Sequence, residues 1–139
     1  FNVLQSSEKG KTMTETTILA LYGLLVVITI VLQASGAMTQ LGMGYLLSSR
    51  DEGRTVTGMS GRLDRALTNS VTAMALFAPA ILLLIATNST TAQTLLLAKA
   101  FLIGRVIYLP AYVFGLIGIR TASWSLGFIA TAILYFLAL

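Results

Sequence analysis

Hydrophobic residues fill four long stretches of this chain, and short polar segments separate them. The stretches cover residues 16–35, 62–87, 92–119 and 122–139. A helix needs about 20 mostly apolar residues to cross the hydrocarbon core of a bilayer. Each stretch approaches or exceeds that length, so the pattern predicts four transmembrane helices. The turn at 88–91 is short and uncharged, which favours an antiparallel hairpin of the second and third helices.

The amino-terminal residues do not share this pattern. Residues 1–12 are mixed and polar, and we assign them no part in the fold. Met13 stands directly before the first hydrophobic stretch, where we expect the natural start. That stretch is too long for a signal peptide and lacks a basic flank immediately before it, so we expect a retained helix. The membrane domain then comprises residues 13–139, with one sizeable loop at 36–61.

Composition supports a membrane protein and removes several kinds of chemistry. Of the 139 residues, 56% are hydrophobic and 10% are charged, values outside the usual range for a soluble domain. Cysteine and histidine are absent, so we expect no disulfide and no metal site, and the commonest general base is missing. The predicted fold class is an all-α integral membrane protein, a four-transmembrane-helix bundle.

Arginines gather at one end of the predicted bundle. The first loop, the start of the second helix and the junction of the third and fourth helices carry Arg50, Arg54, Arg62, Arg65 and Arg120. Because basic residues favour the cytoplasmic side, we expect the loop at 36–61 in the cytoplasm and both termini on the opposite side. The net charge of +4 is scattered among helix ends, which argues against nucleic-acid binding.

Two helices also carry polar faces. The second helix has Arg62, Arg65, Asn69 and Thr72 at successive spacings of three, four and three residues, and the third has Arg105, Tyr108 and Tyr112 at spacings of three and four. Each set lies on one side of a helix of about 3.6 residues per turn. An arginine within hydrocarbon costs roughly 2.5 to 3.5 kcal/mol on insertion scales, so Arg105 is a candidate functional residue.

Structural roles are the alternative for the same residues. Arg62 and Arg65 suit topology determinants that contact lipid headgroups, and the two third-helix tyrosines suit packing inside the bundle. Asn69 fits an interhelical hydrogen bond, and Arg105 fits a pairing with helix carbonyls at an oligomer axis. The coincidence of two polar faces nevertheless favours a shared anionic ligand.

Together these motifs resemble the MAPEG family, the membrane-associated proteins in eicosanoid and glutathione metabolism. The resemblance rests on the run RLDRALTN at 62–69, the run GRVIYLPAY at 104–112, and Arg120 and Trp124. The loop from Arg50 to Gly58 is similar to that of the bacterial branch. The resemblance implies a homotrimer of four-helix subunits in a bacterial inner membrane, with periplasmic termini. Glutathione would lie between neighbouring subunits near the cytoplasmic surface.

The resemblance also implies an activity and a site. The activity is that of a glutathione-dependent membrane transferase or peroxidase acting on lipophilic electrophiles, with glutathione as co-substrate and no metal. The residues that would contact glutathione are Arg62, Arg65, Asn69, Thr72, Arg105, Tyr108 and Tyr112. Arg120 corresponds to the arginine that stabilises the glutathione thiolate. Guanidinium groups suit this ligand because they bind carboxylates in bidentate fashion.

One position departs from the family pattern. Active members usually carry a glutamate that accepts a hydrogen bond from the glutathione amino group, and this chain has Thr72 there. A threonine brings no negative charge, so we expect weaker binding unless Asp64 or Glu52 compensates. This departure favours a second hypothesis, a noncatalytic member that binds membrane lipid or serves as an accessory subunit of a larger membrane complex.

Overall fold

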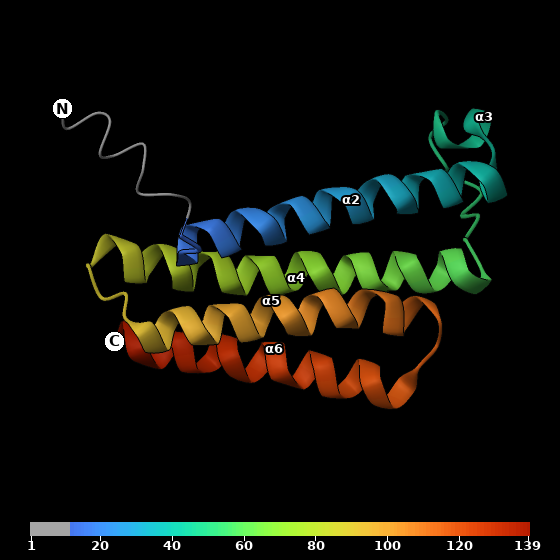
Figure 1. Cartoon of the computed structure of the whole chain (residues 1–139). Coiled ribbons are helices and arrows are strands. Elements are labelled where there is room, and N and C mark those ends of the chain that lie inside the picture. Colours follow the sequence, from blue (N-terminus) through green and yellow to red (C-terminus); the bar gives the residue numbers. More distant parts are fainter. Residues whose placement is uncertain (1–11) are drawn as a thin grey trace.

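The structure, a computed structural model, describes residues 12–139 and folds them into an antiparallel bundle of four long helices (Figure 1). They are α2 (Glu15–Leu41), α4 (Gly58–Ala86), α5 (Ala92–Val113) and α6 (Ile117–Ala138), with a short α3 (Met43–Leu46) in the first connection. All four long helices are long and apolar enough to cross a membrane, and the described residues contain no strand. The predicted all-helical fold with four helices of membrane-spanning length is confirmed. The segment at 1–12 lies, but for Thr12, outside the described residues.

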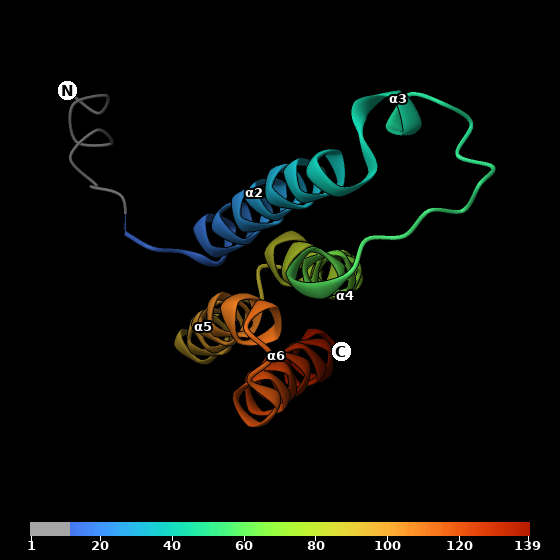
Figure 2. The ribbon, with the colours of Figure 1, turned by 90° about the vertical axis from the view of Figure 1, so that its right-hand side faces the viewer.

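The arginine-rich segments meet at one end of the bundle. Figure 1 shows the connection after α2 and the turn between α5 and α6 at this end, opposite the turn between α4 and α5. Viewed along the helices, α5 and α6 lie side by side, and α4 lies between this pair and α2 (Figure 2). Helix α4 contacts each of the other long helices. It therefore carries its polar residues to the centre of the bundle.

The first loop is shorter than predicted. The sequence pattern places it at 36–61, whereas α2 continues to Leu41 and α4 begins at Gly58. Residues 36–41 include no proline, so nothing in them interrupts the ladder of helical hydrogen bonds. The side chain of Gln40 joins the two ends of the connection. It donates to the carbonyl of Thr57 at 3.1 Å and accepts from the backbone N–H of Thr57 at 2.9 Å.

The third helix also ends earlier than predicted, at Val113 rather than 119. Gly115 takes a φ of 74°, and the N–H of Leu116 donates to the carbonyl of Ala111 at 2.8 Å. This arrangement is a Schellman motif, in which a glycine in the left-handed region ends the helix. Helix α6 consequently begins at Ile117, five residues before the predicted start at 122.

Helices α5 and α6 approach each other closely where the candidate site begins. A Cβ added to Gly104 would lie 2.9 Å from the backbone oxygen of Ser123, so only glycine fits this contact. Deeper in the bundle, the ring of Phe101 stacks on Phe77 with centroids 3.8 Å apart and meets the edge of Tyr22 at 4.8 Å. These buried rings lock α2, α4 and α5 beside the polar residues.

Candidate functional site

Arg105 lies inside the bundle and is only 3% exposed. Its Nη1 donates to Oδ1 of Asn69 at 3.0 Å, and its Nη2 donates to Oγ of Ser70 at 3.0 Å. Its guanidinium carbon lies 4.1 Å from the centroid of the Tyr108 ring. Within residues 12–139, Nε has no hydrogen-bond partner. An amide, a hydroxyl and an aromatic face thus surround this cation, where a carboxylate would be the usual partner of a buried charge.

Two residues of this cluster were not predicted. Ser70 accepts from Arg105 through its hydroxyl, and its backbone oxygen accepts a hydrogen bond of 2.7 Å from the hydroxyl of Tyr22. Tyr22 comes from α2, which carries no polar face in the sequence pattern. The available signal was a tyrosine in the middle of an apolar stretch, because a buried tyrosine hydroxyl usually finds a partner.

A second group of polar residues gathers nearer the arginine-rich end. Nε of Arg65 donates to the hydroxyl of Tyr112 at 3.3 Å, and the guanidinium carbon of Arg120 lies 4.9 Å from the centroid of the same ring. The rings of Tyr112 and Tyr108 are 5.6 Å apart at 59°. Tyr112 therefore links α4, α5 and α6. The polar faces of α4 and α5 therefore meet, where Arg105 contacts Asn69 and where Arg65 contacts Tyr112.

A cavity of about 250 Å³ opens beside Arg120. Its lining consists of Tyr108, Tyr112, Arg120, Thr121 and Trp124. This lining includes a guanidinium, two phenols and a hydroxyl, and it contains no acid. The arrangement can receive an anionic group, since the guanidinium and the phenols all present hydrogen-bond donors.

Arg62 and Thr72 stand apart from this cavity. Nε of Arg62 donates to the carbonyl of Val113 at 2.7 Å, at the last residue of α5. Helix carboxyl ends leave carbonyls without intrahelical partners, and a cation is favourable there. The hydroxyl of Thr72 donates to the carbonyl of Thr68 one turn earlier, at 3.0 Å. Arg62 thus holds the end of α5, and Thr72 is bonded to its own helix.

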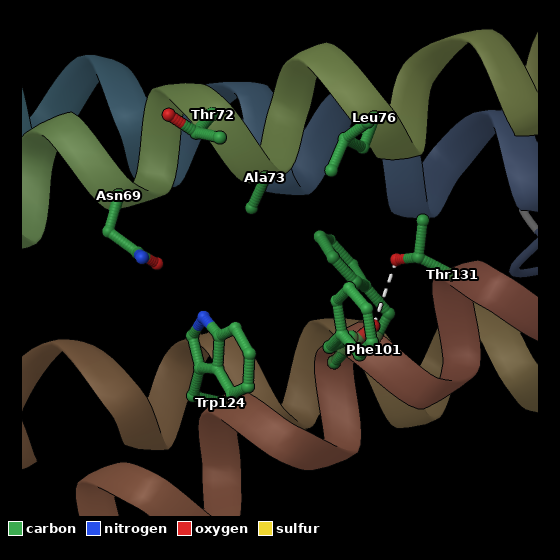
Figure 3. A pocket seen from close by; sticks show the side chains of 9 residues that line it. Asn69, Thr72, Ala73, Leu76, Phe101, Trp124 and Thr131 are labelled. Atoms are coloured by element: carbon green, nitrogen blue, oxygen red, sulfur yellow. Dashed lines mark hydrogen bonds between the residues drawn. The ribbon is translucent and has the colours of Figure 1, made fainter.

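The two acids considered as substitutes for a glutamate at position 72 lie elsewhere. Asp64 accepts from Nε2 of Gln33 at 3.0 Å, on the side of α4 that faces α2. Glu52 forms an ion pair of 2.7 Å with Arg54 in the first connection. Neither acid lines the cavity of Arg120 or a second cavity whose lining includes Asn69 and Thr72 (Figure 3). In the described part of the chain, no compensation for the missing glutamate is present at these positions.

Comparison with known proteins identifies the family. A model described as the MAPEG family matches residues 15–139, which include all four long helices and both polar faces. No curated protein and no solved structure matches the chain. Because the family match covers far more than half of its length, this chain belongs to the MAPEG family.

Proposed function

We propose that this protein is a glutathione-dependent membrane transferase or peroxidase that acts on lipophilic electrophiles. The observation that carries the proposal is the acid-free cavity in which Arg120 lies over the ring of Tyr112 while Arg65 contacts the hydroxyl of that tyrosine. Glutathione has two carboxylates and a thiol, and this cavity offers donors and positive charge for both kinds of group. Membership of the MAPEG family, which includes glutathione transferases and peroxidases, agrees with it.

Arg120 would favour the reactive form of the thiol. A free thiol has a pKa of about 8.5 and is mostly protonated at neutral pH. Lowering that pKa by about 2 requires roughly 2.7 kcal/mol of differential stabilisation of the thiolate. A guanidinium in a partly dry cavity can supply this energy, because an ion pair there is screened less than in water. The thiolate sulfur then attacks the electrophile directly, without a metal.

We assign the other polar residues to two roles. Glutathione would contact Arg65, Tyr112 and the amide of Asn69. The buried Arg105 would instead position Asn69 and Tyr108 through its own contacts with them. Arg62 would act through the end of α5. This division differs from the expectation that all of these side chains contact the ligand.

The proposal includes an assembly and an orientation. We propose a homotrimer in which a neighbouring subunit completes the glutathione site. The residues that line the polar cavity lie on either side of the turn between α5 and α6, and this turn is at the same end of the bundle as the arginine-rich connection at 42–57 (Figure 1). Since basic residues favour the cytoplasmic side, we propose that this end faces the cytoplasm and that both termini lie on the periplasmic side of a bacterial inner membrane.

A noncatalytic family member is the second candidate. One observation favours it: Thr72 provides no charge and its hydroxyl is bonded to the backbone of α4. Because Asp64 contacts Gln33 and Glu52 pairs with Arg54, neither acid stands ready for the amino group of glutathione. A protein of this kind would bind membrane lipid or pack against a larger membrane complex.

Ultraviolet absorbance of the thiolate in the detergent-purified protein distinguishes the two candidates. Wild type, Arg120→Ala and Arg54→Ala are titrated with glutathione near neutral pH. Arg54 is a matched control, because it also lies over a tyrosine ring, at 4.8 Å from Tyr45, but outside the cavity. We expect thiolate in wild type and Arg54→Ala and none in Arg120→Ala. Absence of binding to wild type at millimolar glutathione would overturn the catalytic proposal in favour of the noncatalytic one.

A further inference from the structure

An apolar groove lies between α2, α4 and α5, and no residue of α6 lines it. Its volume is about 380 Å³. The lining consists of Leu32, Met59, Ser60, Leu63, Leu109, Pro110, Val113 and Phe114. Ser60 is the one polar side chain among them, and none of these residues lines the cavity of Arg120. The groove is therefore separate from the candidate site and suited to a hydrocarbon group.

The groove opens to the outside of the subunit. Its rim includes Leu32, Met59 and Phe114, which are 50%, 52% and 64% exposed. On the inner side, a Cβ added to Gly36 would lie 2.6 Å from Oγ of Ser60, so α2 and α4 touch there. This contact closes the back of the groove and leaves its front open to the surrounding membrane.

A cation stands at the edge of this groove. Arg62 lies on α4 between two lining residues, Met59 and Leu63. Its Nε donates to the carbonyl of a third lining residue, Val113, at 2.7 Å. Within residues 12–139, its two Nη groups make no hydrogen bond and it forms no ion pair. The guanidinium is thus fixed through Nε and keeps two groups that can bind a phosphate.

The length of α4 places this cation at the level of the lipid headgroups. The helix has 29 residues and is about 44 Å long at about 1.5 Å per residue, which exceeds the hydrocarbon core of about 30 Å. When the helix is centred on the core, about 7 Å, or roughly five residues, extend beyond it at each end. Arg62 is the fifth residue of α4. It therefore lies at the boundary between headgroups and hydrocarbon.

The surroundings of Arg62 favour a headgroup with a net negative charge. A zwitterionic headgroup brings an ammonium group, which Arg62 repels and which needs an acid beside the phosphate. The lining of the groove contains no acid. Asp64, two residues further along α4, accepts from Gln33 on the side that faces α2. A phosphate without an ammonium group is thus the better partner.

We propose that this groove holds part of one acyl chain of an anionic phospholipid while the Nη groups of Arg62 bind its phosphate. The volume of the groove is more than twice the roughly 150 Å³ that holds benzene, so it accepts a segment of one chain and excludes a second. Basic pockets between transmembrane helices bind anionic headgroups in this way. The binding requires neither glutathione nor the cavity of Arg120, so it does not depend on the proposed function.

Native mass spectrometry of the detergent-purified protein measures this selectivity. Wild type, Arg62→Gln and Arg54→Gln are titrated with phosphatidylglycerol and, separately, with phosphatidylcholine of the same acyl chains. Arg54→Gln is the matched control, because it removes the same charge at the same end of the bundle but in the first connection. We expect wild type and Arg54→Gln to retain phosphatidylglycerol about fivefold more tightly, the ratio that corresponds to about 1 kcal/mol for one basic residue. In Arg62→Gln this preference should disappear.

Two further comparisons identify what is recognised. Arg62→Lys keeps the positive charge, so it should keep the preference for phosphatidylglycerol. An unchanged preference in Arg62→Gln, or an equal loss in Arg62→Lys and Arg62→Gln, would overturn the role of the charge. Glycerol 3-phosphate offers a phosphate without a chain and should not displace the lipid at equal concentration. Its displacement of the lipid would show a phosphate site that makes no use of the groove.

Substitutions at two valines test the groove itself. Val113→Trp fills it and keeps the backbone carbonyl that accepts from Arg62. Val27→Trp adds the same side chain at an exposed position of α2 that does not line the groove, about 140° around the helix from Leu32. We expect phosphatidylglycerol to be retained in Val27→Trp and lost in Val113→Trp. Equal retention in both would refute the groove, and so would the absence of retained lipid in wild type, which would mean that a neighbouring subunit covers it. The comparison of the Arg62 variants does not depend on the folding of Val113→Trp.

Discussion

Asn69 accepts a hydrogen bond of 3.0 Å from the buried guanidinium of Arg105, and this contact joins the polar faces of α4 and α5. The bond is charge-assisted and lies in the bundle interior, where such bonds are stronger than in water. The contact uses Oδ1 of Asn69 and leaves the Nδ2 group of this candidate site residue without a hydrogen bond within residues 12–139. A single contact therefore connects the packing of the bundle with the geometry of the candidate site.

The coupling between these two residues can be measured with a double-mutant cycle of Arg105→Ala and Asn69→Ala. Each single substitution leaves a buried polar partner unsatisfied and should lower the free energy of unfolding by about 2 kcal/mol. The double variant should lose less than the sum, with a coupling energy of about 1 kcal/mol or more. Unfolding in detergent provides the measurement, and strictly additive losses would contradict the contact.

The ring of Tyr112, more than its hydroxyl, should determine the position of Arg120. Tyr112→Phe removes the acceptor for Arg65 but keeps the aromatic face 4.9 Å from the guanidinium. Tyr112→Leu removes the face as well, and a cation–π contact contributes about 0.5 to 1 kcal/mol at a partly exposed site. We expect thiolate formation to be nearly unchanged in the phenylalanine variant and reduced about three- to fivefold in the leucine variant.

Thiolate absorbance at saturating glutathione tests this ranking, because saturation removes any effect of the Tyr112 hydroxyl on glutathione binding. Tyr45→Leu is the matched control, because Tyr45 contacts Arg54 in the same way but lies in the first connection. It should leave the thiolate signal unchanged. A larger loss in Tyr112→Phe than in Tyr112→Leu would mean that the hydroxyl matters more than the ring.

The close approach of α5 and α6 gives a prediction about stability. An alanine at Gly104 places its Cβ 2.9 Å from the backbone oxygen of Ser123, so the helices must separate. Such overpacking costs about 1 to 3 kcal/mol. Gly118 is also helical but has no atom within 4 Å of an added Cβ, and Gly118→Ala should be neutral or stabilising by up to about 1 kcal/mol. Thermal unfolding of the two variants compares them, and equal effects would exclude the packing argument.

Much of the fold was predictable from the sequence, because the bilayer requires long apolar helices and these are visible as hydrophobic runs. The helix ends were less predictable where apolar residues continue through a turn. The run from Phe114 to Ile119 is hydrophobic, yet Gly115 ends the helix within it. Hydropathy indicates whether a residue suits an apolar environment, whereas the left-handed backbone conformation of Gly115 determines where the helix ends.

The candidate site was predictable only in part, because the sequence shows which residues share a helix face but not which residues of other helices they contact. Helical spacing places Arg105 and Tyr108 on one face, and the structure agrees. Spacing does not identify the partner on another helix, so the contacts of Arg105 with Ser70, and of Ser70 with Tyr22, were missed. Those contacts depend on the rotation and depth of packed helices, which periodicity along one helix does not contain.

The most direct functional prediction concerns Thr72. In Thr72→Glu a carboxylate would stand on the same helix face as Asn69, where the family pattern has an acid for the amino group of glutathione. The present hydroxyl donates to the carbonyl of Thr68 and adds no charge. Position 72 is exposed, and an exposed ion pair contributes up to about 1 kcal/mol, so glutathione should bind up to about fivefold more tightly.

Isothermal titration of wild type, Thr72→Glu and Thr68→Glu tests this prediction. Thr68 is exposed and lies one turn earlier on α4, so Thr68→Glu adds the same charge without the same position. A gain at 72 alone, with thiolate still dependent on Arg120, would show that the rest of the site is competent and that the threonine limits binding. An equal gain at both positions would mean that a negative charge at this end of the bundle tightens glutathione binding whatever its exact position. Loss of affinity at 72 would instead show that this chain holds its ligand differently from relatives with an acid there.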